Sequence, residues 1–253
     1  MVKGKDERLV HGRVSSFLIN FVYPCYCLHC HRSTNVTGQA LCEECLALLE
    51  LVDLQERCPS CFSSDYCVED CYCLACAKRT PTLDGIASAF DYMGSAKSLI
   101  RCLKYSDMPH LSRGIAAYLA VQFSRLGWPW PDVLVPVPVS FFKWIERGYN
   151  QSTLLAQHLG KIIGVPVVEA LRRRSGDFSQ AMLGQETREQ LSGQSFFLKR
   201  KASLEGKRLM LIDDVITTGT TLVRCAELLL TAMPASVYGL TACYAIRNNK
   251  IQQ

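Results

Sequence analysis

The sequence predicts an α/β fold, a parallel sheet flanked by helices, that follows a small cysteine-rich module. Strand-like and helix-like segments alternate from residue 86 onward, as a parallel sheet with crossover helices requires. Eleven of the 14 cysteines lie before residue 80, and they include four CxxC pairs. In the segment 208–222, an apolar run meets two acids and a loop of threonine and glycine. A chain of 253 residues has room for both parts.

The first half of the sheet domain contains two expected strands and three expected helices. Residues 86–92 and 133–137 are short apolar runs, which favours buried strands. Residues 96–105, 111–125 and 151–163 carry apolar side chains at intervals of three and four, which predicts amphipathic helices. These elements follow one another in the order β-α-α-β-α.

The second half contains three further expected strands and one helix. Residues 165–170 and 208–212 are apolar and predict strands, and residues 236–246 predict a final strand. Residues 221–231 have helical periodicity. The segment 172–193 is polar and rich in Arg, Gln, Glu and Gly, and a long insertion of this kind in a compact domain is usually functional or disordered.

The four CxxC pairs repeat at a constant spacing. Cys27, Cys30, Cys42 and Cys45 map onto Cys58, Cys61, Cys73 and Cys76 by a shift of 31 residues. A CxxC turn presents two thiolates to one tetrahedral zinc ion, and a second turn completes a structural four-cysteine site. Because the same gap recurs within each half, we predict two zinc sites that pair the turns sequentially. Crossed pairing is the alternative.

A disulfide framework is the other interpretation of these cysteines, and it requires an oxidising compartment. The apolar stretch 17–23 is short, contains Asn20 and lacks the small-residue cleavage site of a signal peptide. Apolar residues from Leu9 to Phe21 instead recur at helical spacing, which predicts an amphipathic N-terminal helix. The sequence has no apolar run of 18 residues. We therefore expect a cytoplasmic zinc protein with no membrane span.

Other cysteines and histidines fall outside the repeat. Cys25, Cys67 and Cys71 are either alternative ligands or surface thiols, and His29 and His31 are alternative ligands beside the first pair. We expect the three cysteines in apolar segments to be small core residues: Cys102, Cys225 and Cys243.

The segment 208–222 predicts a binding site for a phosphate and a sugar. Its apolar run is expected to be a strand that stops at Asp213 and Asp214, whose carboxylates accept hydrogen bonds from sugar hydroxyls. Backbone N–H groups at the start of the following helix favour an anion. The residues expected to hold that phosphate are Thr217, Thr218, Gly219, Thr220 and Thr221. The alternative is a threonine-capped helix without a ligand.

The strand, paired acids, loop and helix together resemble the phosphoribosyl pyrophosphate (PRPP) motif of type I phosphoribosyltransferases. The resemblance implies that Asp213 and Asp214 hold the ribose 2′ and 3′ hydroxyls, that the loop holds the 5′-phosphate, and that Mg²⁺ accompanies PRPP. Enzymes of this family close a mobile hood loop over the substrate, and residues 172–193 lie at the corresponding place. Arg172, Arg173, Arg174 or Lys104 would then neutralise the pyrophosphate.

Nearly the whole chain resembles the ComF family of competence-associated proteins, in which a zinc ribbon precedes a phosphoribosyltransferase-like domain. The motifs that carry this resemblance are the doubled CxxC pairs, LIRCLKY at 99–105, VPVP at 135–138, ERGYNQ at 146–151, the segment 172–188 with Gln180, and LIDDVITTGTTL at 211–222. The resemblance implies an N-terminal helix and double zinc ribbon at residues 1–80 and a phosphoribosyltransferase-like domain at 84–250. Val137, Arg147, Asn150 and Gln151 would border the pyrophosphate.

The resemblance leaves two functions open. In the first, the protein is a phosphoribosyltransferase with an unidentified acceptor, and Asp213, Asp214 and Arg173 serve the transfer. In the second, it is a binding module that acts in DNA uptake, with single-stranded DNA and a competence helicase as candidate partners. The formal charge of +5 does not decide between them, because two four-cysteine zinc sites would lower it to about +1.

The sequence differs from the ComF pattern at several positions. Between VPVP and RGYNQ, where the family carries arginines, residues 141–145 are Phe-Phe-Lys-Trp-Ile, so only Lys143 and Arg147 retain positive charge there. Asp177 replaces a threonine and Leu191 replaces an asparagine. Phe141, Phe142 and Trp144 are interpreted either as a base-stacking or partner surface, or as core and lid-base residues.

Overall fold

The computed structural model describes residues 26–34, 38–66, 73–78, 81–173, 196–199 and 203–245. Several predicted features lie outside these ranges: the N-terminal helix, Cys25, Cys67, Cys71 and residues 174–193 of the hood loop. Within the described ranges, no helix has the length and hydropathy that a membrane span needs.

Four parallel strands form the central sheet. They lie in the order β1 (Gly85–Asp91), β6 (Ser236–Tyr244), β5 (Arg208–Ile216) and β2 (Val133–Pro136), and every neighbouring pair is parallel. Strands at these four places were predicted, and they are confirmed. Parallel strands need crossover connections, so all four carboxyl ends meet at one edge of the sheet.

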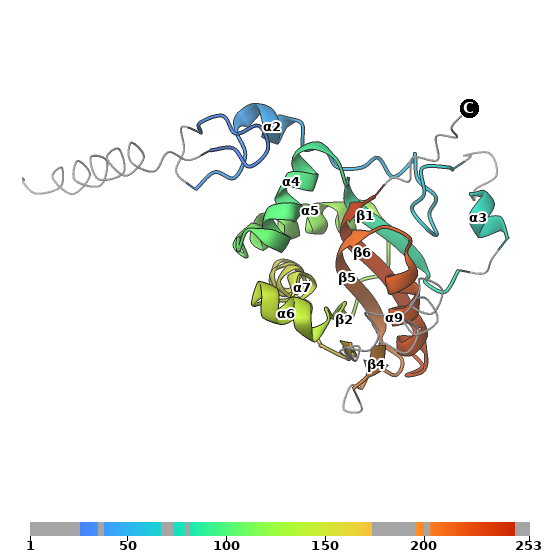
Figure 1. Cartoon of the computed structure of the whole chain (residues 1–253). Helices are drawn as coiled ribbons and strands as arrows, with labels where there is room; N and C mark the ends of the chain where they lie inside the picture. Colours follow the sequence, from blue (N-terminus) through green and yellow to red (C-terminus); the bar gives the residue numbers. More distant parts are fainter. Residues whose placement is uncertain are drawn as a thin grey trace, which may run out of the picture.

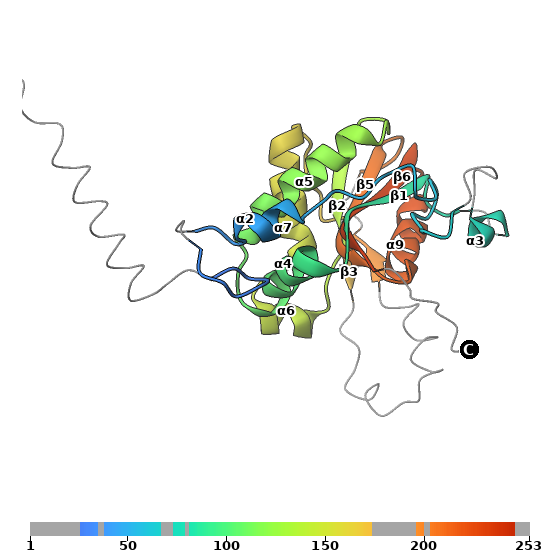
Figure 2. The ribbon, with the colours of Figure 1, turned by 90° about the horizontal axis from the view of Figure 1, so that it is seen from above.

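Helices cover both faces of this sheet (Figures 1 and 2). On one face, α4 (Gly94–Tyr105) packs on β1, α5 (Leu111–Arg125) on β1 and β6, and α7 (Gln151–Ile163) on β2 and β5. On the other face, α9 (Thr220–Leu230) packs on β5, β6 and β4 (Phe196–Leu198). All four helices match the predicted ones within two residues at each end.

The predicted strand at 165–170 is wrong. These residues form one isolated parallel bridge, between Val167 and Leu134 of β2. Pro166 has no N–H and contributes only its carbonyl, which accepts from the Leu134 N–H at 2.9 Å. The strand in this region is β3 (Leu171–Arg173), which pairs antiparallel with β4. Arg172 and Arg173 therefore belong to a paired strand and not to an unstructured loop.

A short helix that the sequence analysis did not predict, α6 (Phe141–Arg147), follows β2. Its N-terminus is capped by Ser140, whose hydroxyl accepts from the Lys143 N–H at 3.4 Å, and it ends at Gly148, which has φ +74°. No residue of α6 is buried, and the rings of its aromatic residues are about half exposed. The interpretation of Phe141, Phe142 and Trp144 as core residues is therefore wrong.

The CxxC cysteines form two separate four-cysteine clusters. Within each, all four sulfur atoms lie within 4.8 Å of one another, and the members are Cys27, Cys30, Cys42 and Cys45 in one, and Cys58, Cys61, Cys73 and Cys76 in the other. Sequential pairing is therefore confirmed, and both sets could hold a metal ion. Cys225 and Cys243 are buried, as predicted, whereas Cys102 is half-buried.

The first cluster, which includes α2 (Glu43–Ala47), packs against the start of α4. The Ser95 hydroxyl donates to the Cys45 carbonyl at 2.9 Å, and His29 Nδ1 lies 3.0 Å from the Ser98 hydroxyl. His29 thus contacts the sheet domain. Figures 1 and 2 show α2 and α3 (Leu74–Ala77) far apart on different sides of the molecule, so the clusters are anchored independently.

The second cluster is anchored at the carboxyl ends of β1 and β6. Arg57, just before Cys58, forms an ion pair of 2.8 Å with Asp91, and both side chains are largely buried. The Arg57 guanidinium also lies 5.7 Å from the Phe62 ring centre and 5.9 Å from that of Tyr244. The Phe62 and Tyr244 rings meet edge to face at 6.0 Å. The cluster and the sheet therefore share one hydrophobic core.

Candidate functional site

The two adjacent acids belong to β5 and not to the loop after it. The ladder between β5 and β6 continues past residue 212 and pairs Asp213 with Thr241 and Ile216 with Tyr244. The prediction that the strand ends at residue 212 is therefore wrong. Because the acids lie within a paired strand, their backbone is fixed at the carboxyl edge of the sheet, where open α/β sheets bind ligands.

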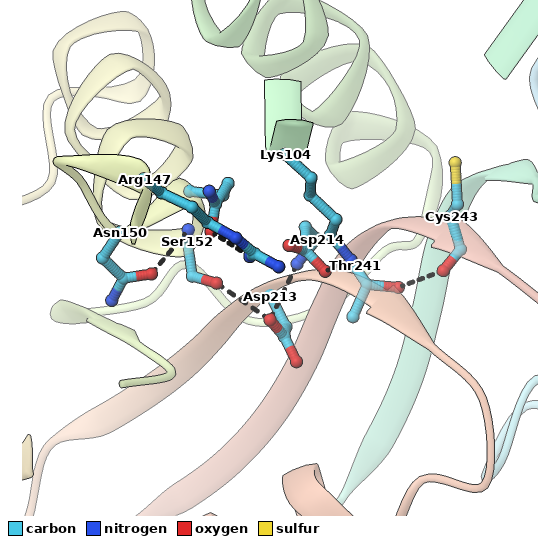
Figure 3. A network of polar contacts seen from close by, with 9 residues as sticks. Lys104, Arg147, Asn150, Ser152, Asp213, Asp214, Thr241 and Cys243 are labelled. Atoms are coloured by element: carbon cyan, nitrogen blue, oxygen red, sulfur yellow. Dashed lines mark hydrogen bonds and ion pairs between the residues drawn. The ribbon is translucent and has the colours of Figure 1, made fainter. Parts of the chain in front are cut away.

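Asp213 is held by two hydrogen bonds to one carboxylate oxygen (Figure 3). Its Oδ1 accepts from the Ser152 hydroxyl at 2.8 Å and from the Asp214 backbone N–H at 2.9 Å. Burial, and then the negative charge of Asp214, raise the pKa of Asp213 to about 7 despite these bonds. The site therefore holds negative charge that the protein itself does not fully compensate.

Ser152 is placed by the N-terminus of α7. The Asn150 side chain caps this helix, with Oδ1 accepting from the Ser152 N–H at 3.0 Å. The Asn150 amide also donates to the carbonyl of Val137 at 3.0 Å, and the Val137 N–H donates to the Ile212 carbonyl at 2.9 Å. Val137, which was predicted to border the pyrophosphate, is buried, and its backbone N–H and carbonyl both bind within the protein.

Asp214 is paired with a lysine from another element. The Lys104 ammonium, in the last turn of α4, lies 2.7 Å from Asp214 Oδ1, and both side chains are more than four-fifths buried. Lys104 was predicted to neutralise a pyrophosphate. The structure brings it to the predicted site, with its charge directed at the carboxylate (Figure 3).

The loop between β5 and α9 is exposed and tightly turned. Gly219 has φ +73°, a conformation that residues with a side chain rarely adopt. The hydroxyls of Thr218 and Thr220 lie 2.8 Å apart, and the Thr220 N–H donates to Thr218 Oγ1 at 3.3 Å. The first N–H groups of a helix have no partner within it, so this loop presents donors and hydroxyls to solvent beside the acids.

Four cations lie around the acids. Partial desolvation lowers the pKa of Lys143, and the charges of Arg147, Arg173 and Lys104 lower it further, as expected for cations in one region. The Arg147 guanidinium lies 5.1 Å from the Tyr105 ring centre, and that of Arg173 lies over Phe196. A polyanionic ligand would relieve this mutual repulsion.

Two donors beside the acids are buried without a partner among the described residues. They are Nε of Arg147 and Nε2 of Gln151, although Arg147 Nη1 does donate to Gln151 Oε1 at 3.0 Å. Unpartnered buried donors are costly. Their position is consistent with a site whose polar network is completed by a ligand.

The structure thus brings together the predicted acids, Lys104, Arg147 and Arg173, with the threonine loop at the end of the same strand. The sequence analysis missed Ser152 as a contact of Asp213. The available signal was the Asn-Gln-Ser sequence at a predicted helix start, but only the fold shows that this start faces the acids.

One protein-family model matches the second half of the chain. The family model described as "Phosphoribosyl transferase domain" matches residues 146–250. This range includes α7, both acids, the threonine loop and α9.

Several named proteins are similar over much of the chain. Competence protein F of Haemophilus influenzae is 29% identical, covering 80% of this chain and 90% of that protein. DNA utilization protein YhgH of Escherichia coli K12 is 28% identical, covering 68% and 77%. Competence protein ComFC of Bacillus subtilis is 29% identical, covering 56% and 57%.

Replacing one of the acids should stabilise the unliganded protein. With a pKa raised to about 7, Asp213 destabilises the fold as the pH rises from about 4 through 7, because the folded state resists its ionisation. Asparagine keeps the acceptor oxygen and removes the charge. We therefore expect Asp213→Asn to unfold like the wild type at pH 4 and to gain about 1–2 kcal/mol above pH 7, measured by urea denaturation.

Asp132 provides a control, because replacing this acid by asparagine should lower the stability of the protein at neutral pH. Arg208 donates to Asp132 from its side chain and its backbone, which lowers the pKa of Asp132 to about 2. Ionised Asp132 therefore adds to the free energy of unfolding above pH 4, and this stabilisation is lost as the pH falls toward 2. The Asp132→Asn variant should be less stable than the wild type at pH 7. An Asp213→Asn protein that is also less stable at pH 8 would contradict the charge argument.

Proposed function

We propose that this chain, a ComF-like protein with a phosphoribosyl transferase domain, binds PRPP or a related ribose phosphate together with Mg²⁺. The observation that carries the proposal is the position of Asp213 and Asp214 at the carboxyl end of β5, beside the Thr217–Thr221 loop that opens α9. In this arrangement, the loop takes the 5′-phosphate and the acids take the ribose hydroxyls.

The charges around the acids support this ligand. The raised pKa of Asp213 means that a cation or a hydroxyl donor at the acids would stabilise their ionised form. Adjacent carboxylates and a diphosphate supply the oxygen ligands that Mg²⁺ prefers, and the bound ion would neutralise diphosphate charge. Arg147 and Arg173 lie close enough to Lys143 to act on the same polyanion.

Lys104 is proposed to respond to the ribose and to contact the pyrophosphate of the bound ligand. It pairs with Asp214 in the unliganded site. When ribose hydroxyls donate to Asp214, the Lys104 ammonium is released from a full ion pair and can contact the pyrophosphate. Ser152 keeps Asp213 oriented throughout, because its hydroxyl is fixed by the first turn of α7.

We further propose two uses of the bound ligand. In the first, the protein is a phosphoribosyltransferase: an acceptor attacks C1, the C1–O bond breaks, and pyrophosphate leaves with the electron pair. Asp213 and Asp214 would stabilise positive charge that develops on the ribose, and Arg173 would stabilise the leaving group. In the second, the protein acts in DNA uptake and handles single-stranded DNA, with a competence helicase as a candidate partner. The names of its relatives, competence and DNA utilization proteins, support this second use.

Calorimetric titration with PRPP and Mg²⁺ tests the ligand. The wild type should bind in the micromolar range, and a variant with both Asp213→Asn and Asp214→Asn should lose at least a hundredfold in affinity, because it loses charged acceptors at the ribose. Asp132→Asn, at the opposite edge of the sheet, is the matched control and should bind normally. Equal binding by the wild type and the double variant would refute the proposed site.

A DNA role is favoured by the exposed aromatic face of α6. Phe142 and Ile145 are more than half exposed and lie beside Lys143. Bases stack on exposed aromatic rings, and phosphates pair with nearby cations. Phe142→Ala should weaken binding of a 20-nucleotide oligo(dT) by about 1–3 kcal/mol in fluorescence anisotropy, and the wild-type affinity should fall steeply with added salt.

Trp130 provides the control for this experiment. Its side chain is 52% exposed, but it lies before the amino end of β2, away from α6. Trp130→Ala should leave the affinity for DNA unchanged. A salt-independent affinity, or equal losses in both variants, would argue against a stacking surface on α6.

We propose that each four-cysteine cluster holds one structural zinc ion. Each cluster has the donor set and the closeness that tetrahedral zinc requires. This proposal places the protein in the cytoplasm, where thiols stay reduced. Mass spectrometry of the intact protein should find two zinc ions. Cys42→Ser and Cys76→Ser, one per cluster, should each lose one ion, and loss of both ions from either variant would contradict independent clusters.

A further inference from the structure

We propose that an acidic groove between residues 48–57 and the start of α4 is the docking site for the N-terminal segment of this chain, residues 1–21. The groove and the segment have opposite charges, and both are rich in apolar side chains. The proposal does not depend on the ribose phosphate, because Lys104 and Ser152, which hold the two acids, do not line this groove.

The acidic groove has a volume of about 370 Å³ and lies where the first cysteine cluster meets the sheet domain. One side is the segment 48–57, which connects the two clusters, and the other side is the end of β1 and the start of α4. The Val52 N–H donates to the Ala89 carbonyl at 2.9 Å, and Gln122 Nε2 donates to the Val52 carbonyl at 3.1 Å. The connecting segment is therefore fixed to the sheet domain, and the groove is part of the fold.

Two large apolar side chains are exposed at the acidic groove. Leu48 is 74% exposed and Met93 is 62% exposed. Both line the groove, Leu48 from the connecting segment and Met93 from the turn before α4. Single exposed apolar residues are common on protein surfaces, but two that face one hollow form a surface that a covering segment would remove from water.

Exposed acids line the same groove. They are Glu50, Asp53 and Glu56. Within the described ranges, none of the three forms an ion pair. Arg57 also lines the groove, but its charge is offset by Asp91. The groove therefore attracts a positively charged partner.

The sequence of residues 1–21, which lie outside the described ranges, complements the groove in charge and in hydrophobicity. This segment contains four basic residues and two acidic ones. Its large apolar residues recur at helical spacing: Leu9, Val10, Val14, Phe17, Leu18 and Phe21. Binding of the apolar face of an amphipathic helix in a groove is a recurrent mode of peptide recognition.

The segment is joined to the chain beside the groove. His29 lines the groove, and its Nδ1 lies 3.0 Å from the Ser98 hydroxyl of α4. Phe21 precedes His29 by eight residues, which span at most about 28 Å when extended. Because a short tether gives a high effective concentration, the chain's own segment is favoured over that of a second copy. The docked segment would cover the junction between the first cluster and the sheet domain.

Photocross-linking in the full chain tests this docking. Benzoylphenylalanine incorporated in place of Phe17 should form adducts with peptides that contain Leu48 or Met93, identified by mass spectrometry. Mixing isotope-labelled with unlabelled protein separates adducts within one chain from adducts between copies. Adducts between copies would overturn the proposal and assign the groove to the segment of a second copy. Adducts on neither side of the groove would also overturn it.

A charge exchange separates electrostatic docking from nonspecific contact. Replacing all three groove acids by lysine should lower the yield of adducts about tenfold, because like charges then face each other. Replacing Lys3, Lys5 and Arg8 by glutamate in the same protein should restore the yield. A yield that survives the first exchange, or one that the second exchange does not restore, would refute the charge complementarity.

Glu205→Lys is the matched control. Glu205 is an exposed acid in the turn before β5, and it does not line the groove. Its replacement should leave the yield of adducts unchanged. Because all the replaced groove acids are exposed, every variant should also keep the circular dichroism spectrum of the wild type. A loss in Glu205→Lys equal to that of the groove variant would contradict the proposed site.

Discussion

Two carboxylates stand side by side at the end of one buried strand, and much of the surrounding structure serves to hold them there. Two neighbouring helices offset the negative charge of the carboxylates: α4 supplies the Lys104 ammonium and α7 supplies the Ser152 hydroxyl. Both contacts come from helix ends, where side chains reach the sheet edge without disturbing the helix. The compensation is incomplete, as the raised pKa of Asp213 shows. Such residual electrostatic strain is typical of sites that await a ligand.

The second cysteine cluster supports the same edge from the other side. Phe62, between its two CxxC turns, packs on Tyr244, and Tyr244 pairs with Ile216, the residue directly before the threonine loop. Arg57 completes this packing by joining the cluster to Asp91 at the end of β1. A metal ion that orders this cluster would therefore also stabilise the backbone from which the loop begins. The first cluster contacts α4 instead, through Ser95 and His29, so the two clusters support different walls.

Sequence periodicity predicted the elements that are amphipathic or fully buried. The helices at 111–125 and 151–163 have the predicted limits, because their apolar stripes are unbroken and their last turns end at the surface. The strand at 165–170 was wrong because the prediction followed apolar composition and gave no weight to Pro166, which has no N–H to donate to the ladder. Helix α6 was missed because its apolar residues face solvent, although Ser140 and Gly148 mark its ends.

Site residues that are neighbours in the sequence could be predicted from it. Site residues that only folding brings together could not. Asp213, Asp214 and the threonine loop form one segment, so their spacing revealed them. Ser152 lies 61 residues before Asp213 and looks like an ordinary residue of a helix start. Only the docking of α7 between β2 and β5 brings its hydroxyl to the acid.

The same docking connects Asp213 to the end of β2. Asn150 fixes the start of α7 to the end of β2 through Val137, while Ser152 fixes the acid. Lys104 at the end of α4 contacts Asp214 directly, so cationic and acidic groups meet at this edge of the sheet. The capped first turn of α7 is therefore the element that holds Asp213 in place relative to the end of β2.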